Sequence, residues 1–376
     1  TRSALTIART SGMSTIVVKV VKASPRAAEV DAFIGDHVVE HAGDIARVTA
    51  EHFGISRQAV NRHLARLVEE GKLSAEGSAR SRKYVPVLLV DESFSLPLSS
   101  SLEEHRVWMD RVEPHLRDIP ENVKDVCSYG FTEMLNNAID HSEGTEVSIH
   151  VQRSVSEIVL YISDNGVGIF RRIARDLKLD DERHAIFELS KGKLTTDATR
   201  HSGEGIFFAS RMFDAFALAS GELALHRVEG ESWLLDRREP WLDVDQEFVE
   251  GTTVMMTISP RATRTSKEVF DSFSAPLDDD YGFIRTHVPV ALARHGAENL
   301  ISRSQAKRLL ARFERFKEVL LDFKGVPMIG QAFADEVFRV FANLHPDTHL
   351  TWDNATPEVE SMIRRALSAA KTAAPS

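Results

Sequence analysis

The stretch that most constrains this chain is the run of residues 164–169, which reads Asp-Asn-Gly-Val-Gly-Ile. It follows an alternating apolar run, 156–162, that predicts a strand. A carboxylate at a strand end, here Asp164, can accept a hydrogen bond from a ligand amine. The glycines Gly166 and Gly168 let the backbone adopt positive φ and approach a ligand closely. An Asn-Gly turn can carry the same residues without any ligand, so the motif needs partners elsewhere in the chain.

A predicted helix at 122–141 supplies the first partners. Glu133 and Asn137 are four residues apart and therefore share one helix face, which Asp140 and His141 continue. An Asn oxygen can ligate Mg²⁺, and a Glu can take a proton from water. The alternative for this helix taken alone is a polar face exposed to solvent.

Two further glycine-containing stretches lie downstream. Residues 203–206 precede a predicted helix that runs to Phe213, and free N–H groups at such a helix start can bind phosphate. Residues 251–258 predict a turn and a strand. The polar, irregular part of residues 180–202 predicts a mobile lid, for which a solvated loop is the alternative. The basic residues of the lid that could contact phosphate are Lys191, Lys193 and Arg200.

These four motifs occur in an order that resembles the Bergerat ATP-binding fold of gyrase, heat-shock chaperone, histidine kinase and mismatch-repair ATPases. The resemblance predicts a Bergerat α/β sandwich over residues 95–262 and implies ATP and Mg²⁺ as cofactors. It implies that Asn137 is the Mg²⁺ ligand and that Glu133 is the general base that polarises the attacking water. It also implies that Asp164 bonds the adenine amino group and that Thr253 lies near it.

The resemblance also assigns the glycines. Gly166 and Gly168 would line the nucleotide, and Gly203 and Gly205 would lie by the phosphates under the lid.

Residues 25–88 predict three short helices and a hairpin. Ser56 is a good N-cap for the third helix, and between Gly54 and Tyr84 there are seven basic and three acidic side chains in a chain whose net charge is −10. The pattern resembles winged helix-turn-helix DNA-binding domains, whose recognition helix enters a major groove. A solvated helix face or a protein-binding winged helix is the alternative. The residues that would contact DNA are Ser56, Arg57, Gln58, Asn61, Arg62, Arg66, Arg80, Arg82 and Lys83.

The C-terminal part, residues 275–376, alternates predicted strands and helices, which indicates a small α/β domain. The segments 320–326 and 329–338 resemble STAS-like domains, the relatives of anti-sigma-factor antagonists. In those antagonists a phosphorylated Ser begins the helix after the strand. The corresponding residues here are Gln331 and Ala332, which cannot accept phosphate, so docking of a regulatory protein is the expected role.

The rest of the chain adds little. Residues 1–24 stay unassigned, residues 91–101 predict a connector, and residues 273–280 predict a polar linker. With one cysteine, Cys127, an internal disulfide and a cysteine-rich zinc site are excluded. No apolar run is long enough for a membrane span and no secretory signal is evident, so a cytoplasmic location is expected.

The expected architecture is therefore an α+β multidomain chain with a DNA reader, an ATP site and an interaction domain. The first hypothesis is a DNA-binding regulator that is controlled by its nucleotide state and can hydrolyse ATP slowly. A protein kinase of the anti-sigma-factor or histidine-kinase type, acting on a separate partner, is the alternative. No helical hairpin with a phosphoacceptor His precedes the ATP domain. Whether the chain forms a homodimer is left open.

Overall fold

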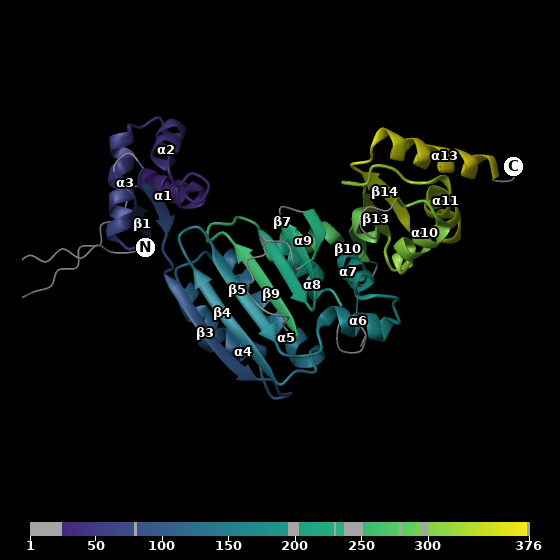
Figure 1. Ribbon diagram of the computed structural model, residues 1–376, viewed down its shortest axis with the longest axis horizontal. Coiled ribbons are helices and arrows are strands. Elements are labelled where there is room, and N and C mark those ends of the chain that lie inside the picture. Colours follow the sequence, from purple (N-terminus) through teal and green to yellow (C-terminus); the bar gives the residue numbers. More distant parts are fainter. Residues whose placement is uncertain are drawn as a thin grey trace, which may run out of the picture.

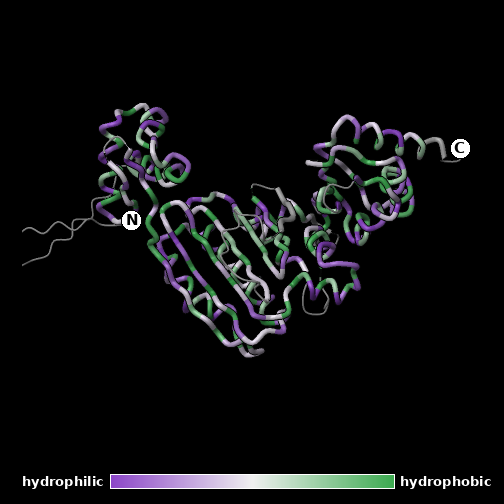
Figure 2. Tube along the Cα trace, viewed as in Figure 1, coloured by the Kyte–Doolittle hydropathy of each residue, from purple (hydrophilic) through white to green (hydrophobic). Residues whose placement is uncertain are grey.

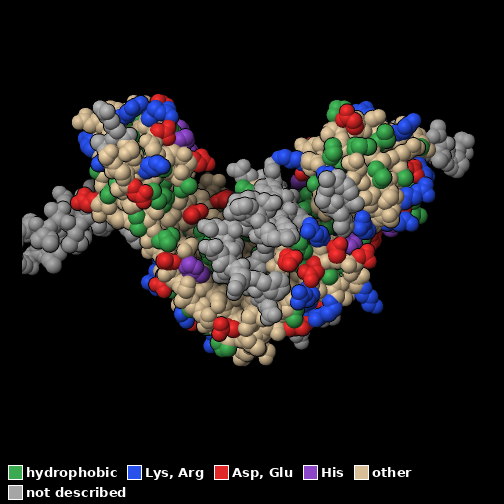
Figure 3. All heavy atoms as spheres, in the orientation of Figure 1, with side chains coloured by type: hydrophobic (Ala, Val, Ile, Leu, Met, Phe, Trp, Pro, Cys, Tyr) green, Lys and Arg blue, Asp and Glu red, His purple; other side chains and the backbone are tan. Residues whose placement is uncertain are grey.

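The computed structural model describes residues 25–78, 81–194, 203–228, 231–236, 251–277, 280–294 and 299–373. The unassigned segment 1–24 lies outside these ranges. The described parts form a helical N-terminal domain, a central domain on a seven-stranded sheet and a C-terminal α/β domain. The two outer domains stand at opposite ends of the central domain, with an open gap between them (Figure 1, Figure 3). The central domain therefore lies between the two outer domains (Figure 1).

The N-terminal domain has the three helices and the hairpin expected from its sequence. Gly54, at φ 62°, ends the second helix, and the Ser56 hydroxyl begins the third by accepting the Ala59 N–H at 3.2 Å. The buried faces of the helices form a small core separate from that of the other domains. The elements are α1 (Pro25–His37), α2 (Ile45–Phe53), α3 (Arg57–Glu69), β1 (Leu73–Glu76) and β2 (Lys83–Pro86).

The central sheet is antiparallel throughout, in the order β3-β4-β5-β9-β6-β7-β8. Hydrophobic and hydrophilic residues alternate along β4, and buried and partly exposed residues alternate along β9, as the period of two requires when one face is covered (Figure 2). The strands are β3 (Val90–Pro97), β4 (Glu146–Arg153), β5 (Ile158–Asp164), β6 (Ala215–Ser220), β7 (Leu223–Val228), β8 (Glu231–Asp236) and β9 (Thr252–Ile258).

Two strands of this sheet differ from the sequence-based expectation. The stretch 91–101, predicted to be a connector, contains most of the edge strand β3, in which Phe94 and Leu96 pack on the core between exposed polar residues. Ser, Asp and Pro are tolerated at a sheet edge, where one row of backbone groups faces solvent. Strand β6 was not predicted, because its alanine-rich sequence has weak strand propensity.

Helices cover one face of the sheet. The long helix α5 (Glu121–His141) and α8 (Gly205–Met212) lie side by side across β5, β6 and β9. The remaining helical segments are α4 (Glu104–Val107), η1 (Trp108–Val112), η2 (Glu113–Leu116), α6 (Ile169–Leu177), α7 (Glu182–Lys191) and α9 (Ser266–Phe273). Within the described ranges, every helix is too short or too polar to cross a membrane.

The C-terminal domain is a parallel three-stranded sheet, β12 (Arg285–Pro289), β13 (Glu318–Asp322) and β14 (His349–Asp353), covered by helices. The helical segments are η3 (Val290–Ala293), α10 (Arg303–Leu310), η4 (Phe313–Arg315), α11 (Gln331–Asp335), η5 (Glu336–Phe341), α12 (Ala342–Leu344) and α13 (Pro357–Ala373). The predicted linker 273–280 is not a linker, since it contains β10 (Ser274–Leu277), which pairs with β11 (Asp280–Phe283).

The central and C-terminal domains share one continuous hydrophobic core. Phe283 links them, because its ring lies 4.7 Å from the Phe207 ring of α8 and 5.4 Å from the Phe316 ring after η4. The interface between the C-terminal domain and the central domain is therefore part of the same hydrophobic core.

Candidate functional site

A cavity of about 380 Å³ lies between α5, α8 and the ends of β5 and β9. Its size is within the range of small-molecule sites. Predicted site residues from three separate motifs meet in its lining, and they are Glu133, Asn137, Asp164, Gly203 and Gly205.

The turn after β5 is built to present the Asp164 carboxylate. Asp164 is buried, and its Oδ1 accepts the Gly166 N–H at 2.9 Å. Burial raises the pKa of this carboxyl above its ordinary value. A Cβ at Gly166 would lie 2.1 Å from the Ser142 carbonyl oxygen, so only glycine fits there. The Asn165 Oδ1 accepts the Thr145 N–H at 2.8 Å, which ties the turn to the start of β4 and gives Asn165 a structural role.

The structure places Thr252, instead of the predicted Thr253, in the cavity wall next to Asp164. Thr252 is paired with Asp164 across the sheet, and its Oγ1 accepts the Ile169 N–H at 3.0 Å. The Thr253 hydroxyl bonds to Ser163 Oγ at 2.8 Å. Successive residues of a strand face opposite sides of the sheet, so the Thr252 hydroxyl faces the cavity and the Thr253 hydroxyl faces away from it.

This pair of threonines allows a matched test. We expect Thr252→Val to weaken ATP binding, because the variant removes a hydroxyl from the cavity wall. The same hydroxyl accepts the Ile169 N–H, so its loss should also lower the free energy of unfolding by about 1–3 kcal/mol. Thr253→Val removes a hydroxyl of the same kind from the opposite face and should leave ATP affinity unchanged. Titration calorimetry with ATP and Mg²⁺ measures both. Equal losses in the two variants would contradict the assignment of Thr252.

The polar face of α5 turns toward α8. A Cβ at Gly205 would lie 2.0 Å from Glu133 Oε2, so the absence of a side chain lets the carboxylate approach the start of α8. Burial raises the pKa of the neighbouring Tyr129, and the charges of Glu133 and Glu204 add to this shift. A carboxylate beside the start of a helix is placed to hold a proton close to a phosphate bound there.

The oxygen-bearing residues of α5 are suited to a hard cation. Asn136, Asn137 and Asp140 line the cavity. Mg²⁺ takes one or two protein oxygens and completes its shell with water and phosphate oxygens. Among the described residues, no cluster of three or more His, Cys, Asp or Glu side chains could hold a metal by itself. This donor set fits a Mg²⁺ that arrives with the nucleotide.

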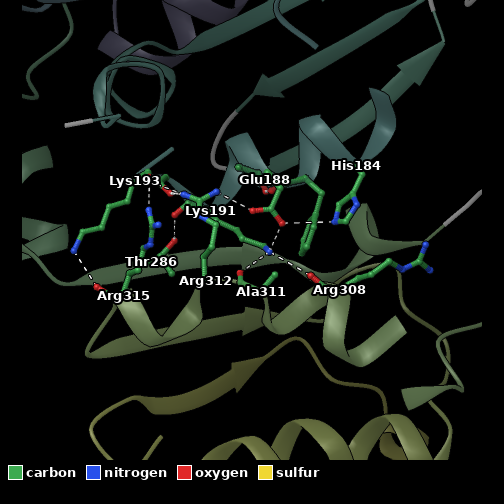
Figure 4. A network of polar contacts seen from close by, with 12 residues as sticks. His184, Glu188, Lys191, Lys193, Thr286, Arg308, Ala311, Arg312 and Arg315 are labelled. Atoms are coloured by element: carbon green, nitrogen blue, oxygen red, sulfur yellow. Dashed lines mark hydrogen bonds and ion pairs between the residues drawn. The ribbon is translucent and has the colours of Figure 1, made fainter. Parts of the chain in front are cut away.

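The predicted lid lysines do not line the cavity. Lys191 is fully buried, and its Nζ donates to Glu188 Oε1 at 2.6 Å and to the Ala311 carbonyl at 2.9 Å. Lys193 Nζ donates to the Arg315 carbonyl at 3.0 Å. Both lysines thus bond to the C-terminal domain, which packs over the end of α7 (Figure 4). This contact between two domains could not be predicted from the local sequence. Arg200 lies outside the described residues.

Arg172 of α6 is a cavity residue that the sequence analysis missed. Its guanidinium donates to the His141 carbonyl at the end of α5 and lies near Asp176 and Glu143. Arg172 follows Ile169 by about one helical turn, so the spacing predicts that both side chains lie on the same face of α6.

On the N-terminal domain, most of the residues proposed to contact DNA are exposed. One exception is Arg66, whose Nη2 donates to Asp31 of α1 at 2.6 Å beside His63. Arg66 is therefore partly committed to packing α3 against α1. Arg80 lies outside the described residues. The exposed ones are Ser56, Arg57, Gln58, Asn61, Arg62, Arg82 and Lys83.

Comparison with known proteins identifies two of the three domains. Residues 128–262 match the family model of the histidine kinase-, DNA gyrase B- and HSP90-like ATPases. Residues 305–360 match a STAS-like domain of unknown function. No curated protein matches the chain significantly. Both family resemblances drawn from these parts of the sequence are confirmed, and neither match covers the N-terminal domain.

Proposed function

We propose that this chain, which carries a histidine kinase-, gyrase- and HSP90-like ATPase domain followed by a STAS-like domain, is a DNA-binding regulator whose affinity for DNA depends on its bound nucleotide. The observation that supports this most directly is a contact between the central sheet and the N-terminal domain. ATP with Mg²⁺ is the proposed ligand, and the cytoplasm is the proposed location.

The contact is made by Arg261, which follows β9. Its Nε donates to Asp36 Oδ1 of α1 at 2.8 Å, and its Nη1 donates to the Val155 carbonyl of the β4–β5 turn at 2.7 Å. Gly35 in α1 lets this contact form, since a Cβ there would lie 2.9 Å from Arg261 Nη2. A glycine inside a helix costs roughly 1 kcal/mol relative to alanine, so the close packing explains its presence.

Strand β9 connects this contact to the cavity. At its start, Thr252 and Val254 line the cavity, and past its end Arg261 holds α1. A displacement of β9 on nucleotide binding would therefore be transmitted to the N-terminal domain through a rigid, fully paired strand.

The residues of the cavity fit ATP. Asp164 and Thr252 offer a buried carboxylate and a hydroxyl for the adenine edge. The backbone at Gly203 and Gly205, where α8 begins, is suited to the phosphates, and Asn137 is suited to Mg²⁺. Bound ATP would supply a terminal phosphate open to attack by water. Glu133 would orient that water and take its proton, which permits slow hydrolysis.

The N-terminal domain fits DNA. The exposed face of α3 carries Arg57, Gln58, Asn61 and Arg62, which are residue types that bond base edges and phosphates. The hairpin β1–β2 adds Arg82 and Lys83 beside it. This basic surface belongs to a chain of net charge −10, so the affinity for DNA would be local to this domain.

A DNA-retardation titration with pooled duplexes, with and without ATP and Mg²⁺, tests the proposal. We expect the midpoint to shift with nucleotide in the unaltered chain. In Arg261→Ala the DNA and ATP affinities should persist but lose their coupling, because the bond to Asp36 is gone. Arg264→Ala, which breaks an ion pair with Asp214 inside the central domain, is the control and should keep the coupling. Identical DNA affinity in every nucleotide state would refute the proposal.

A separate experiment tests the alternative function, a protein kinase. The helix α11 begins at Gln331, which is followed by Ala332, so the start of this helix has no hydroxyl that could accept phosphate. With labelled ATP, we expect label only in free phosphate. Label that appears on an added partner protein would favour the kinase.

A further inference from the structure

The last residue of α7, Lys191, and the two residues after it are bonded by side chains of the C-terminal domain (Figure 4). The Thr286 hydroxyl donates to the Lys191 carbonyl at 2.6 Å. Arg312 Nη2 donates to the Gly192 carbonyl at 3.0 Å and to the Lys193 carbonyl at 2.5 Å. Arg315 Nη1 donates to the Lys193 carbonyl at 3.3 Å. Three consecutive carbonyls of the ATPase domain are thus satisfied by side chains from the STAS-like side of the junction.

Arg312 is the central residue of this junction. Besides the two carbonyls, its Nη1 donates to Glu188 Oε2 at 2.8 Å, and Glu188 also bonds the buried Lys191. The side chains of Glu188 and Lys191 are 3% and 0% exposed, so this ion pair is closed to water. Hydrogen bonds that involve charged groups in such a setting are stronger and more geometrically restrictive than exposed ones.

The segment held in this way, residues 191–193, lies between two residues of the cavity wall. Leu189 and Leu194, on either side of residues 191–193, both line the cavity. The Leu194 N–H donates to the Gly203 carbonyl at 3.0 Å, and Gly203 lines the cavity as well. Gly192 and Lys193 have positive φ values of 80° and 51°. For Lys193, which is not glycine, this backbone conformation is unfavourable and persists only where surrounding contacts hold it.

From these contacts we infer that Arg312 of the STAS-like domain is a positioning residue of the nucleotide site. By fixing the carbonyls of Gly192 and Lys193, it fixes Leu194 and Gly203 at the cavity wall. Binding free energies are reciprocal, so ATP bound in the cavity must in turn stabilise the junction around Arg312. A partner that binds the STAS-like domain and disturbs residues 308–316 would then change the affinity for ATP. This inference rests on the proposed nucleotide site but is independent of DNA binding.

The test measures ATP affinity in three variants. Arg312→Ala should weaken ATP binding by roughly 5- to 150-fold, the range typical of coupling between sites. Arg312→Lys keeps the charge beside Glu188 but cannot bridge both carbonyls, so its affinity should be intermediate. Arg339→Ala removes an ion pair with Asp335 inside the same domain, away from the junction, and should leave the affinity unchanged. Calorimetry with ATP and Mg²⁺ gives the constants.

A second measurement needs no variant. Hydrogen exchange on the unaltered chain should show that ATP slows exchange in residues 308–316, which do not line the cavity. Unchanged exchange there, or a folded Arg312→Ala variant with full ATP affinity, would overturn the role of Arg312 and leave the ATP site intact. If the unaltered chain binds no ATP, the nucleotide site itself is refuted, and this inference is refuted with it.

Discussion

Replacing Asp164 with Asn is expected to abolish the response of DNA binding to ATP while leaving DNA binding without nucleotide unchanged. The Asp164 carboxylate accepts the Gly166 N–H at Oδ1 and a backbone hydrogen bond from Thr252, and its remaining acceptor capacity would serve a ligand amine. In the variant, the amide oxygen would take the place beside Gly166, and the amide NH₂ would meet the adenine amino group. Two donors would then face each other.

The expected loss of ATP affinity follows from the type of bond removed. A hydrogen bond to a charged group is worth about 1.5–3 kcal/mol, which corresponds to a roughly ten- to 150-fold weaker affinity. The control is Ser163→Ala, which removes a hydroxyl from the preceding residue on the opposite face, where it bonds Thr253. Calorimetry and the retardation titration are made on both variants. Unaltered ATP affinity in Asp164→Asn would remove Asp164 from the site.

Replacing Glu188 with Ala is expected to lower the free energy of unfolding by about 3–5 kcal/mol, the usual cost of leaving a buried charge without its partner. Glu188 is the only acid that the structure shows in direct contact with both Lys191 and Arg312, as far as the described residues extend. Burial already lowers the pKa of Lys191 to about 8 despite this partner. Without Glu188 the lysine would have to lose its proton or draw water into the junction.

Chemical denaturation measures this effect, and two comparisons interpret it. Glu318→Ala breaks the exposed pair with Arg285 and should cost at most about 1 kcal/mol. The double variant Glu188→Gln with Lys191→Met removes both charges, keeps an acceptor for Arg312 and should recover most of the stability. A Glu188→Ala variant no less stable than Glu318→Ala would show that the junction contributes little.

Much of the fold was predictable because its signals are local. Alternating residues marked β4, β5 and β9, and helical spacing marked α5. Several glycines of the nucleotide motifs stand where a side chain would clash with the neighbouring chain, which keeps the motif visible in the sequence. A Cβ at Gly251, for example, would lie 1.9 Å from the Asp164 carbonyl oxygen. The edge strand β3 was missed because its polar composition is also that of a loop.

The sequence by itself determined which residues could bind a nucleotide and in what order they occur, because a carboxylate, an amide or a glycine carries its chemistry wherever it lies. Only the tertiary structure decided which of them face the cavity. Strand pairing selected Thr252 over Thr253, since register sets the face of each residue. Packing of the STAS-like domain turned Lys191 away from the cavity and brought in Arg312, a residue far along the chain. Such long-range contacts leave no local pattern, because they depend on which surfaces the folded domains bury against each other.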